Sequence, residues 1–181
     1  MQHTLVALVE DKPGVLNRVA SLFRRRNYNI ESLTVGHTET PGVSRMTIVV
    51  NATPTIATLV ERNLYKLVNV INVQDVTQEP AVMRDLALIK VAANSTTRAE
   101  ILQLVDIFRA RIVDVAADSV IVEITGTEDK IESLVELLRP LGILEMVRTG
   151  RVSMVRGNGF KTKAKISGVD STRGNGHLGD A

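Results

Sequence analysis

The sequence predicts an α+β protein built from two tandem βαββαβ units, and three observations support this prediction. Short apolar runs of strand character alternate with segments whose apolar residues recur at helical spacing, and the same order occurs twice. The 181 residues suffice for two small domains. With 44% hydrophobic residues, each domain can bury a core. The repeat lies in the order of the elements and not in residue identity, so it indicates architecture only.

The first unit is assigned to residues 1–78, and its order of elements is the ferredoxin-like arrangement. Its strands are expected at 3–9, 30–37, 43–50 and 69–76, and its helices at 13–25 and 54–67. The apolar stripe of each helix should face the sheet. These stripes comprise Leu16, Val19, Ala20 and Phe23 in the first helix, and Ile56, Leu59, Val60, Asn63, Leu64 and Leu67 in the second.

The second unit, residues 79–157, is expected to repeat this order after a connection near Pro80. Thr127 is the expected N-cap of its second helix. Its strands are predicted at 85–92, 112–115, 120–124 and 143–148, with a further edge strand at 151–155, and its helices at 97–109 and 128–139. Six of the 12 glycines lie in residues 157–181, where apolar periodicity ends. Residues 158–181 are therefore predicted to form a flexible tail.

The composition argues against a catalytic role. The chain has no Cys, which excludes thiol nucleophiles, thiolate metal sites and disulfides. His3, His37 and His177 show no metal-ligand spacing, so no metal site is predicted. There is no phosphate-binding loop and no Ser-His-Asp order that this topology would bring together. We expect a protein that is not an enzyme and that holds no cofactor itself.

We expect neither nucleic acids nor membranes as partners of this chain. RNA-recognition modules share the βαββαβ order, but they stack bases on aromatic residues of their central strands. Aromatic residues make up only 3% here, and Tyr28 and Tyr65 fall on a turn and a helix. The net charge is only +2, and no apolar run approaches the roughly 20 residues of a membrane span. Without a signal peptide at the first residues, the chain is expected to be cytoplasmic.

The most informative motif is Asp11-Lys12-Pro13-Gly14-Val15-Leu16, which directly follows an apolar strand. Pro is well placed at a helix start, and the first amides of a helix have no intrahelical acceptor. Together with the positive end of the helix dipole, these N–H groups form a site for a small anion such as a carboxylate. Gly14 lacks a Cβ, so a ligand can approach the backbone. An ordinary helix start, however, has the same residues.

Asn27 and Asn29 lie at the start of the next strand and offer uncharged amide groups. Together with Asp11 they suit a zwitterion, whose carboxylate would bind the helix N-terminus and whose ammonium group would bind Asp or Asn oxygens. The alternative is that both Asn residues simply permit the turn. The residues alone leave both interpretations open.

The ordered succession of motifs resembles the small (regulatory) subunit of acetolactate synthase. The first half is similar to its ACT domain, in His3–Val6, Val9–Arg18 and Arg25–Leu33. The second half is similar to its C-terminal domain, in Arg84–Val91, Arg98–Ile101, Phe108–Val115 and Arg148–Arg151. The resemblance covers residues 2 to about 157, and only the tail departs from it.

This resemblance implies a function that spacing cannot show. Small subunits of this family activate a large catalytic subunit, which carries thiamine diphosphate, magnesium and FAD, and confer feedback inhibition by valine or another branched-chain amino acid. ACT domains commonly form homodimers with effectors at the interface. By this likeness, Asp11, Lys12, Pro13, Gly14, Val15 and Leu16 of one chain and Asn29 and Ile30 of the other would bind the effector. The C-terminal unit would activate the catalytic subunit. A free-standing ACT-type amino-acid sensor is the alternative.

Overall fold

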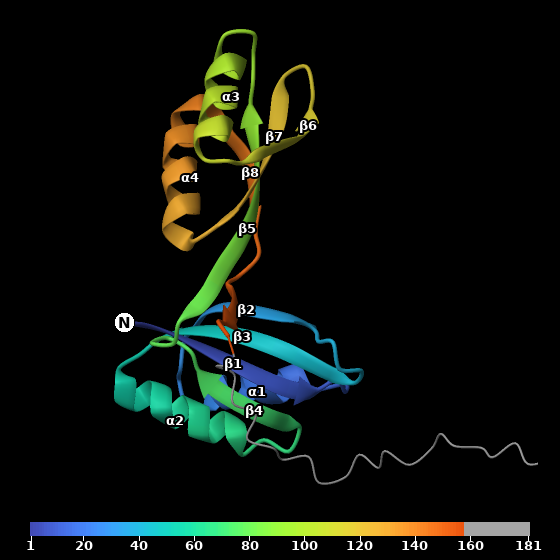
Figure 1. The fold of residues 1–181 in the computed structure, drawn as a ribbon, viewed down its shortest axis with the longest axis vertical. Coiled ribbons are helices and arrows are strands. Elements are labelled where there is room, and N and C mark those ends of the chain that lie inside the picture. The colour runs from blue at the N-terminus through green and yellow to red at the C-terminus, as the bar shows by residue number, and fades with distance from the viewer. Residues whose placement is uncertain (158–181) are drawn as a thin grey trace, which may run out of the picture.

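The chain folds into two antiparallel sheets, each with two helices on one face (Figure 1). This architecture is seen in a computed structural model that describes residues 1–157. The elements of the first unit are β1 (Gln2–Glu10), α1 (Val15–Arg25), β2 (Ile30–His37), β3 (Val43–Asn51), α2 (Pro54–Tyr65) and β4 (Val70–Asp75). The two tandem ferredoxin-like units predicted from the sequence are confirmed. The predicted tail, 158–181, lies outside the described residues.

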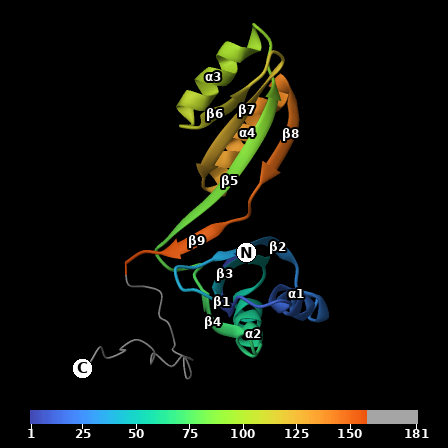
Figure 2. The same cartoon turned by 90° about the vertical axis from the view of Figure 1, so that its right-hand side faces the viewer.

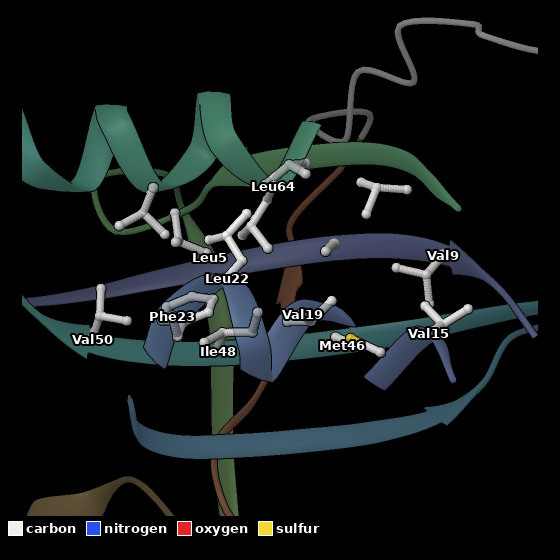
Figure 3. Packing of buried hydrophobic residues seen from close by; sticks show 14 residues of the cluster. Leu5, Val9, Val15, Val19, Leu22, Phe23, Met46, Ile48, Val50 and Leu64 are labelled. Atoms are coloured by element: carbon white, nitrogen blue, oxygen red, sulfur yellow. The ribbon is translucent and has the colours of Figure 1, made fainter. Parts of the chain in front are cut away.

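The first sheet has the strand order β2-β3-β1-β4, so β2 and β4 are its edges. Alternate residues of its central strands point toward the helices, because side chains of a strand alternate between the two faces. Leu5 pairs with Ile48, and both are fully buried beneath α1 and α2 (Figure 3). Phe23 of α1 completes this core and contacts the ring of Tyr28 edge-on, with ring centroids 6.2 Å apart.

The second sheet repeats the arrangement with the order β6-β7-β5-β8. Helices α3 and α4 cover one face, and their buried side chains form a separate core with the central strands. The elements are β5 (Ala81–Ala92), α3 (Thr97–Ile107), β6 (Arg111–Val115), β7 (Ser119–Gly126), α4 (Glu128–Gly142), β8 (Ile143–Arg148) and β9 (Val152–Val155). None of the helices within residues 1–157 is both long and apolar enough to span a bilayer.

A two-stranded ribbon joins the units. β5 begins four residues earlier than the sequence predicts, and Ala81–Arg84 pair with β9 before the rest of β5 enters the second sheet. The ribbon lies over the face of the first sheet that the helices leave open (Figure 2). There Val155 and Met83 pack with Val6 and Val76 in a small apolar cluster. β9 therefore contacts the first unit, although its pairing partner β5 belongs to the second.

Helix α1 differs from its prediction in start and in orientation. It begins at Val15 and not at residue 13, because Gly14 has a left-handed backbone (φ +83°) that cannot belong to the helix. The later start goes with a rotated buried face: Val15 and Leu22 are buried, whereas the predicted Leu16 is 47% exposed. The predicted Ala20 is exposed as well. A similar error affects α2, where Ala57 is buried in place of Leu59.

The N-cap residues of α2 and α4 are both Thr, which allows a matched comparison of their contributions to stability. Thr53 accepts a hydrogen bond from the Ile56 N–H (3.4 Å), whereas Thr127 occupies the same position of α4 without a side-chain cap bond. Thr53→Ala is expected to lower the free energy of unfolding by about 1 kcal/mol, the usual cost of losing such a cap. Thr127→Ala should cost clearly less. Chemical denaturation of both variants measures the difference, and equal losses would contradict the assignment.

Candidate functional site

The turn between β1 and α1 presents an uncapped helix N-terminus. Gly14 occupies the N-cap position, and no side chain caps the helix. The N–H of Val15 makes only a long turn bond to the Lys12 carbonyl (3.4 Å), and the first helical bond runs from the Arg18 N–H to the Gly14 carbonyl (3.0 Å). The amides of Leu16 and Asn17 thus lie in the first turn, where the helix supplies no acceptor. This end of the helix can receive an anion.

Space in front of the turn is open. A Cβ built on Gly14 would meet no atom within 4 Å, and Asp11, Lys12 and Pro13 are exposed beside it. Leu16 adds an exposed apolar side chain, while Val15 anchors the helix in the core. A small ligand with a carboxylate and an aliphatic group could therefore reach both the amides and an apolar surface.

Asp11 does not cap the helix. Its carboxylate lies 3.4 Å from Nδ1 of His37, at the end of β2, and its N–H donates to the Gly42 carbonyl (2.8 Å). Asp11 is half-exposed in this pair, so an ammonium group can still approach the carboxylate. The Asp11 carboxylate thus supplies a negative charge at the turn that can bind the ammonium group of a zwitterion.

A polar network behind the turn was not predicted from the sequence. Lys12 pairs with Glu10 (2.9 Å), Glu10 accepts a hydrogen bond from the side chain of the buried Asn69 (2.6 Å), and Arg18 donates to Asn69. The network ties both flanks of the Gly14 turn to the segment that precedes β4. Glu10 and Arg18 flank the motif in the sequence, but nothing there indicates Asn69.

The network makes the stability of the turn depend on pH. The hydrogen bonds from Lys12 and then from Asn69 hold the pKa of Glu10 below its ordinary value of 4.5. Since the pKa is depressed in the folded state, the stabilisation is present above pH 4.5 and is lost as the pH falls through the folded-state value. Thermal unfolding from pH 6 downward should show a smaller acid loss for Glu10→Gln than for the unaltered chain. Identical acid profiles would contradict this account.

Asn29 and Ile30 lie at the opposite end of the sheet from the turn in the same chain. β2 begins at Ile30, paired with Val50, and ends at His37, paired with Ser44. At about 3.3 Å per residue, a strand of this length separates the two groups by roughly 25 Å. One chain therefore does not bring its predicted site residues together. Asn27 has a left-handed backbone (φ 53°), which supports the turn interpretation for this residue.

The fold and its turn define the class of protein. A family model described as the AHAS small subunit-like ACT domain matches residues 5–72, and one described as the small subunit of acetolactate synthase matches residues 84–157. No group of His, Asp or Glu within residues 1–157 could hold a metal ion. Residues 1–157 thus form an ACT domain followed by a second ferredoxin-like unit.

Similar proteins specify the family. A probable acetolactate synthase small subunit from Archaeoglobus fulgidus is 55% identical, with 87% of this chain and 99% of the relative covered. The acetolactate synthase small subunit of Bacillus subtilis is 46% identical over 91% of this chain and 96% of its own length. The crystal structure of the Thermotoga maritima small subunit superposes with a TM-score of 0.81 at 43% identity, covering 87% of this chain and 99% of that one. The chain belongs to the acetolactate synthase small-subunit family.

Proposed function

We propose that the chain activates a thiamine-diphosphate-dependent acetolactate synthase catalytic subunit and makes it sensitive to feedback inhibition by valine or a related branched-chain amino acid. The observation that carries the proposal is the uncapped N-terminus of α1, in an ACT domain of this family. The catalytic subunit would supply thiamine diphosphate, magnesium and FAD, and this chain would supply no reacting group.

The effector site is proposed to form between two copies of the chain. β2 is an edge strand, and no other strand within residues 1–157 pairs with its outer side. If two β2 strands pair antiparallel about their midpoints, the first residue of one lies opposite the last residue of the other. Ile30 of the partner subunit would then lie beside His37, which contacts Asp11 at the turn. This pairing would bring together the residues that a single chain holds apart.

Exposed apolar side chains support such a pairing. Val35 of β2 pairs with the buried Met46 and faces the helices, yet it is 43% exposed because no strand covers the edge. Leu16 is similarly exposed at the start of α1. In the proposed site the first-turn amides would bind the valine carboxylate, and Asp11 or Asn29 of the partner subunit would bind its ammonium group. Leu16, with Ile30 of the partner subunit, would contact the isopropyl group.

The test is reconstitution with a catalytic subunit, preceded by a thermal-shift titration of the full chain. A ligand that binds only the folded state raises the melting temperature in step with its concentration. We expect a rise with valine, leucine or isoleucine and none with an unrelated amino acid such as lysine. In reconstitution, acetolactate formation should increase with the subunit and decrease again with the effector. Effector binding without any change in acetolactate formation would overturn the proposal in favour of a free-standing sensor.

A further inference from the structure

The segment between β8 and β9, residues 149–151, crosses directly over β2 of the ACT domain. We call it the strap. The backbone N–H of Arg151 donates to Oγ of Ser32 (3.0 Å). Gly150 lies so close to β2 that an added Cβ would overlap Oγ of Ser32 and lie 2.8 Å from Oγ1 of Thr34. The strap therefore fits against β2 without room for a side chain.

The guanidinium group of Arg151 joins β1 to α4. Nη1 donates to Oγ1 of Thr4 on β1 (3.1 Å), and Nη2 donates to Oε1 of Gln2 (3.1 Å). Nη2 also pairs with the carboxylate of Glu128 at 2.7 Å. Glu128 is the first residue of α4, so this ion pair reaches the second unit. The Arg151 side chain is only 16% exposed, which reduces the screening of the pair by water.

Thr4 also contacts the other connection between the units. Its N–H donates to Oγ1 of Thr77 (2.9 Å), and its carbonyl accepts from the N–H of Val76 (2.9 Å). Both connections between the units therefore meet at one residue of β1. Beside the strap lies a cavity of about 400 Å³, lined by β2 on one side and by Asp85 and Arg148 on the other. The units are thus not packed tightly here, and the strap bridges them.

We infer that Arg151 couples the effector site to the second unit: it is a positioning residue through which effector binding at β2 changes the placement of α4. The inference rests on the proposed function. Its physical basis is that β2 contributes both to the proposed effector site and to the contact with the strap. Asn29 and Ile30 lie at the start of β2, and Ser32, under the strap, follows two residues later. A shift of β2 on effector binding would move the strap and, through the Arg151–Glu128 ion pair, the N-terminus of α4.

Coupling of this kind requires that the two arrangements bind the effector with different affinity. Breaking the link should therefore separate binding from response. Arg151→Gln removes the ion pair, and Glu128→Gln removes its other partner without changing the strap. Arg84→Gln is the matched control, because Arg84 is exposed and donates to the carbonyl of its neighbour Met83.

The experiment uses the full chain with its catalytic subunit and measures valine binding by calorimetry, activation without valine, and inhibition by valine. For Arg151→Gln and Glu128→Gln we expect valine binding within about twofold of the unaltered chain and activation retained, but the fold-inhibition at saturating valine reduced about fivefold or more, as expected for lost coupling. Arg84→Gln should behave like the unaltered chain. A purely structural role would lower binding, activation and inhibition together, and that result would overturn the inference, as would unchanged inhibition.

Failure of the proposed function would look different, because the unaltered chain itself would then show neither valine binding nor inhibition. Hydrogen exchange on the free chain tests the link in that case. Glu128→Gln should raise the exchange of β2 amides next to the strap, at residues 32–35, because Arg151 would lose its anchor on α4. Unchanged exchange at these residues would show that Arg151 does not connect α4 to β2 and would overturn the inference.

Discussion

Replacing Gly14 with Asp is expected to abolish valine inhibition while the subunit still folds and activates its catalytic partner. The new carboxylate would lie at the uncapped N-terminus of α1, where it competes with the effector for the same amides. It also repels the effector's carboxylate. Hydrogen bonds to a charged group contribute about 1.5–3 kcal/mol each, so the loss of one or two should weaken valine binding by about tenfold or more.

The fold should tolerate this substitution. Gly14 has a left-handed backbone, which costs an L-residue about 1–2 kcal/mol, but a Cβ there meets no atom within 4 Å. A negative charge at a helix N-terminus offsets part of that cost, by about 0.3–1 kcal/mol. Activation, which we assign to the second unit, should therefore be unaffected.

Two control variants separate strain from charge in this prediction. Gly14→Ala introduces the same backbone strain without the carboxylate and should weaken inhibition less. Gly157→Asp carries the same charge at another open, left-handed glycine (φ +61°) and should leave inhibition unchanged. Inhibition curves and denaturation of the three variants provide the measurement. If Gly14→Asp is inhibited at the same valine concentrations as the unaltered chain, the turn is not the effector site.

Local sequence patterns predicted most of the elements. The bounds 30–37 and 143–148 agree with β2 and β8. The start of each segment is marked, since β2 follows the Asn27–Asn29 turn and β8 follows Gly142, which has a left-handed backbone (φ 98°). The start of α1 was predicted less well, because Pro13-Gly14 is compatible with two registers. Which register occurs depends on whether Gly14 is helical, and the apolar pattern does not determine the backbone angle of Gly14.

Long-range arrangements were beyond such patterns. The strand 151–155 was predicted approximately, but not its pairing with Ala81–Arg84 or its position over the first sheet. A four-residue strand carries too little information to specify a partner. The contacts of Arg151 were missed for a similar reason, since an Arg after Thr-Gly gives no indication of four acceptors in two units. Asn29 and the Gly14 turn were assigned to one site by resemblance, and a single chain does not test this assignment.

The two units have separate cores, so a cavity in one should affect only the function of that unit. Leu134 of α4 is fully buried, and Leu134→Ala should lower the free energy of unfolding by about 2–5 kcal/mol through lost burial and a residual cavity. Calorimetry should show the loss in the second unit. Reconstituted acetolactate synthase should lose activation, while valine binding to the free subunit should remain.

Leu137→Ala is the matched control for this prediction, because Leu137 lies on the same helix but is 49% exposed. Its cost should stay within about 0.5 kcal/mol, as for most surface substitutions. Phe23→Ala gives the reciprocal case, since Phe23 belongs to the first core and its truncation should cost about 3–5 kcal/mol. The Phe23→Ala variant should therefore lose more of its valine binding than of its activation. If Leu134→Ala and Phe23→Ala impair both functions equally, each function requires both units, and the division of roles between them is wrong.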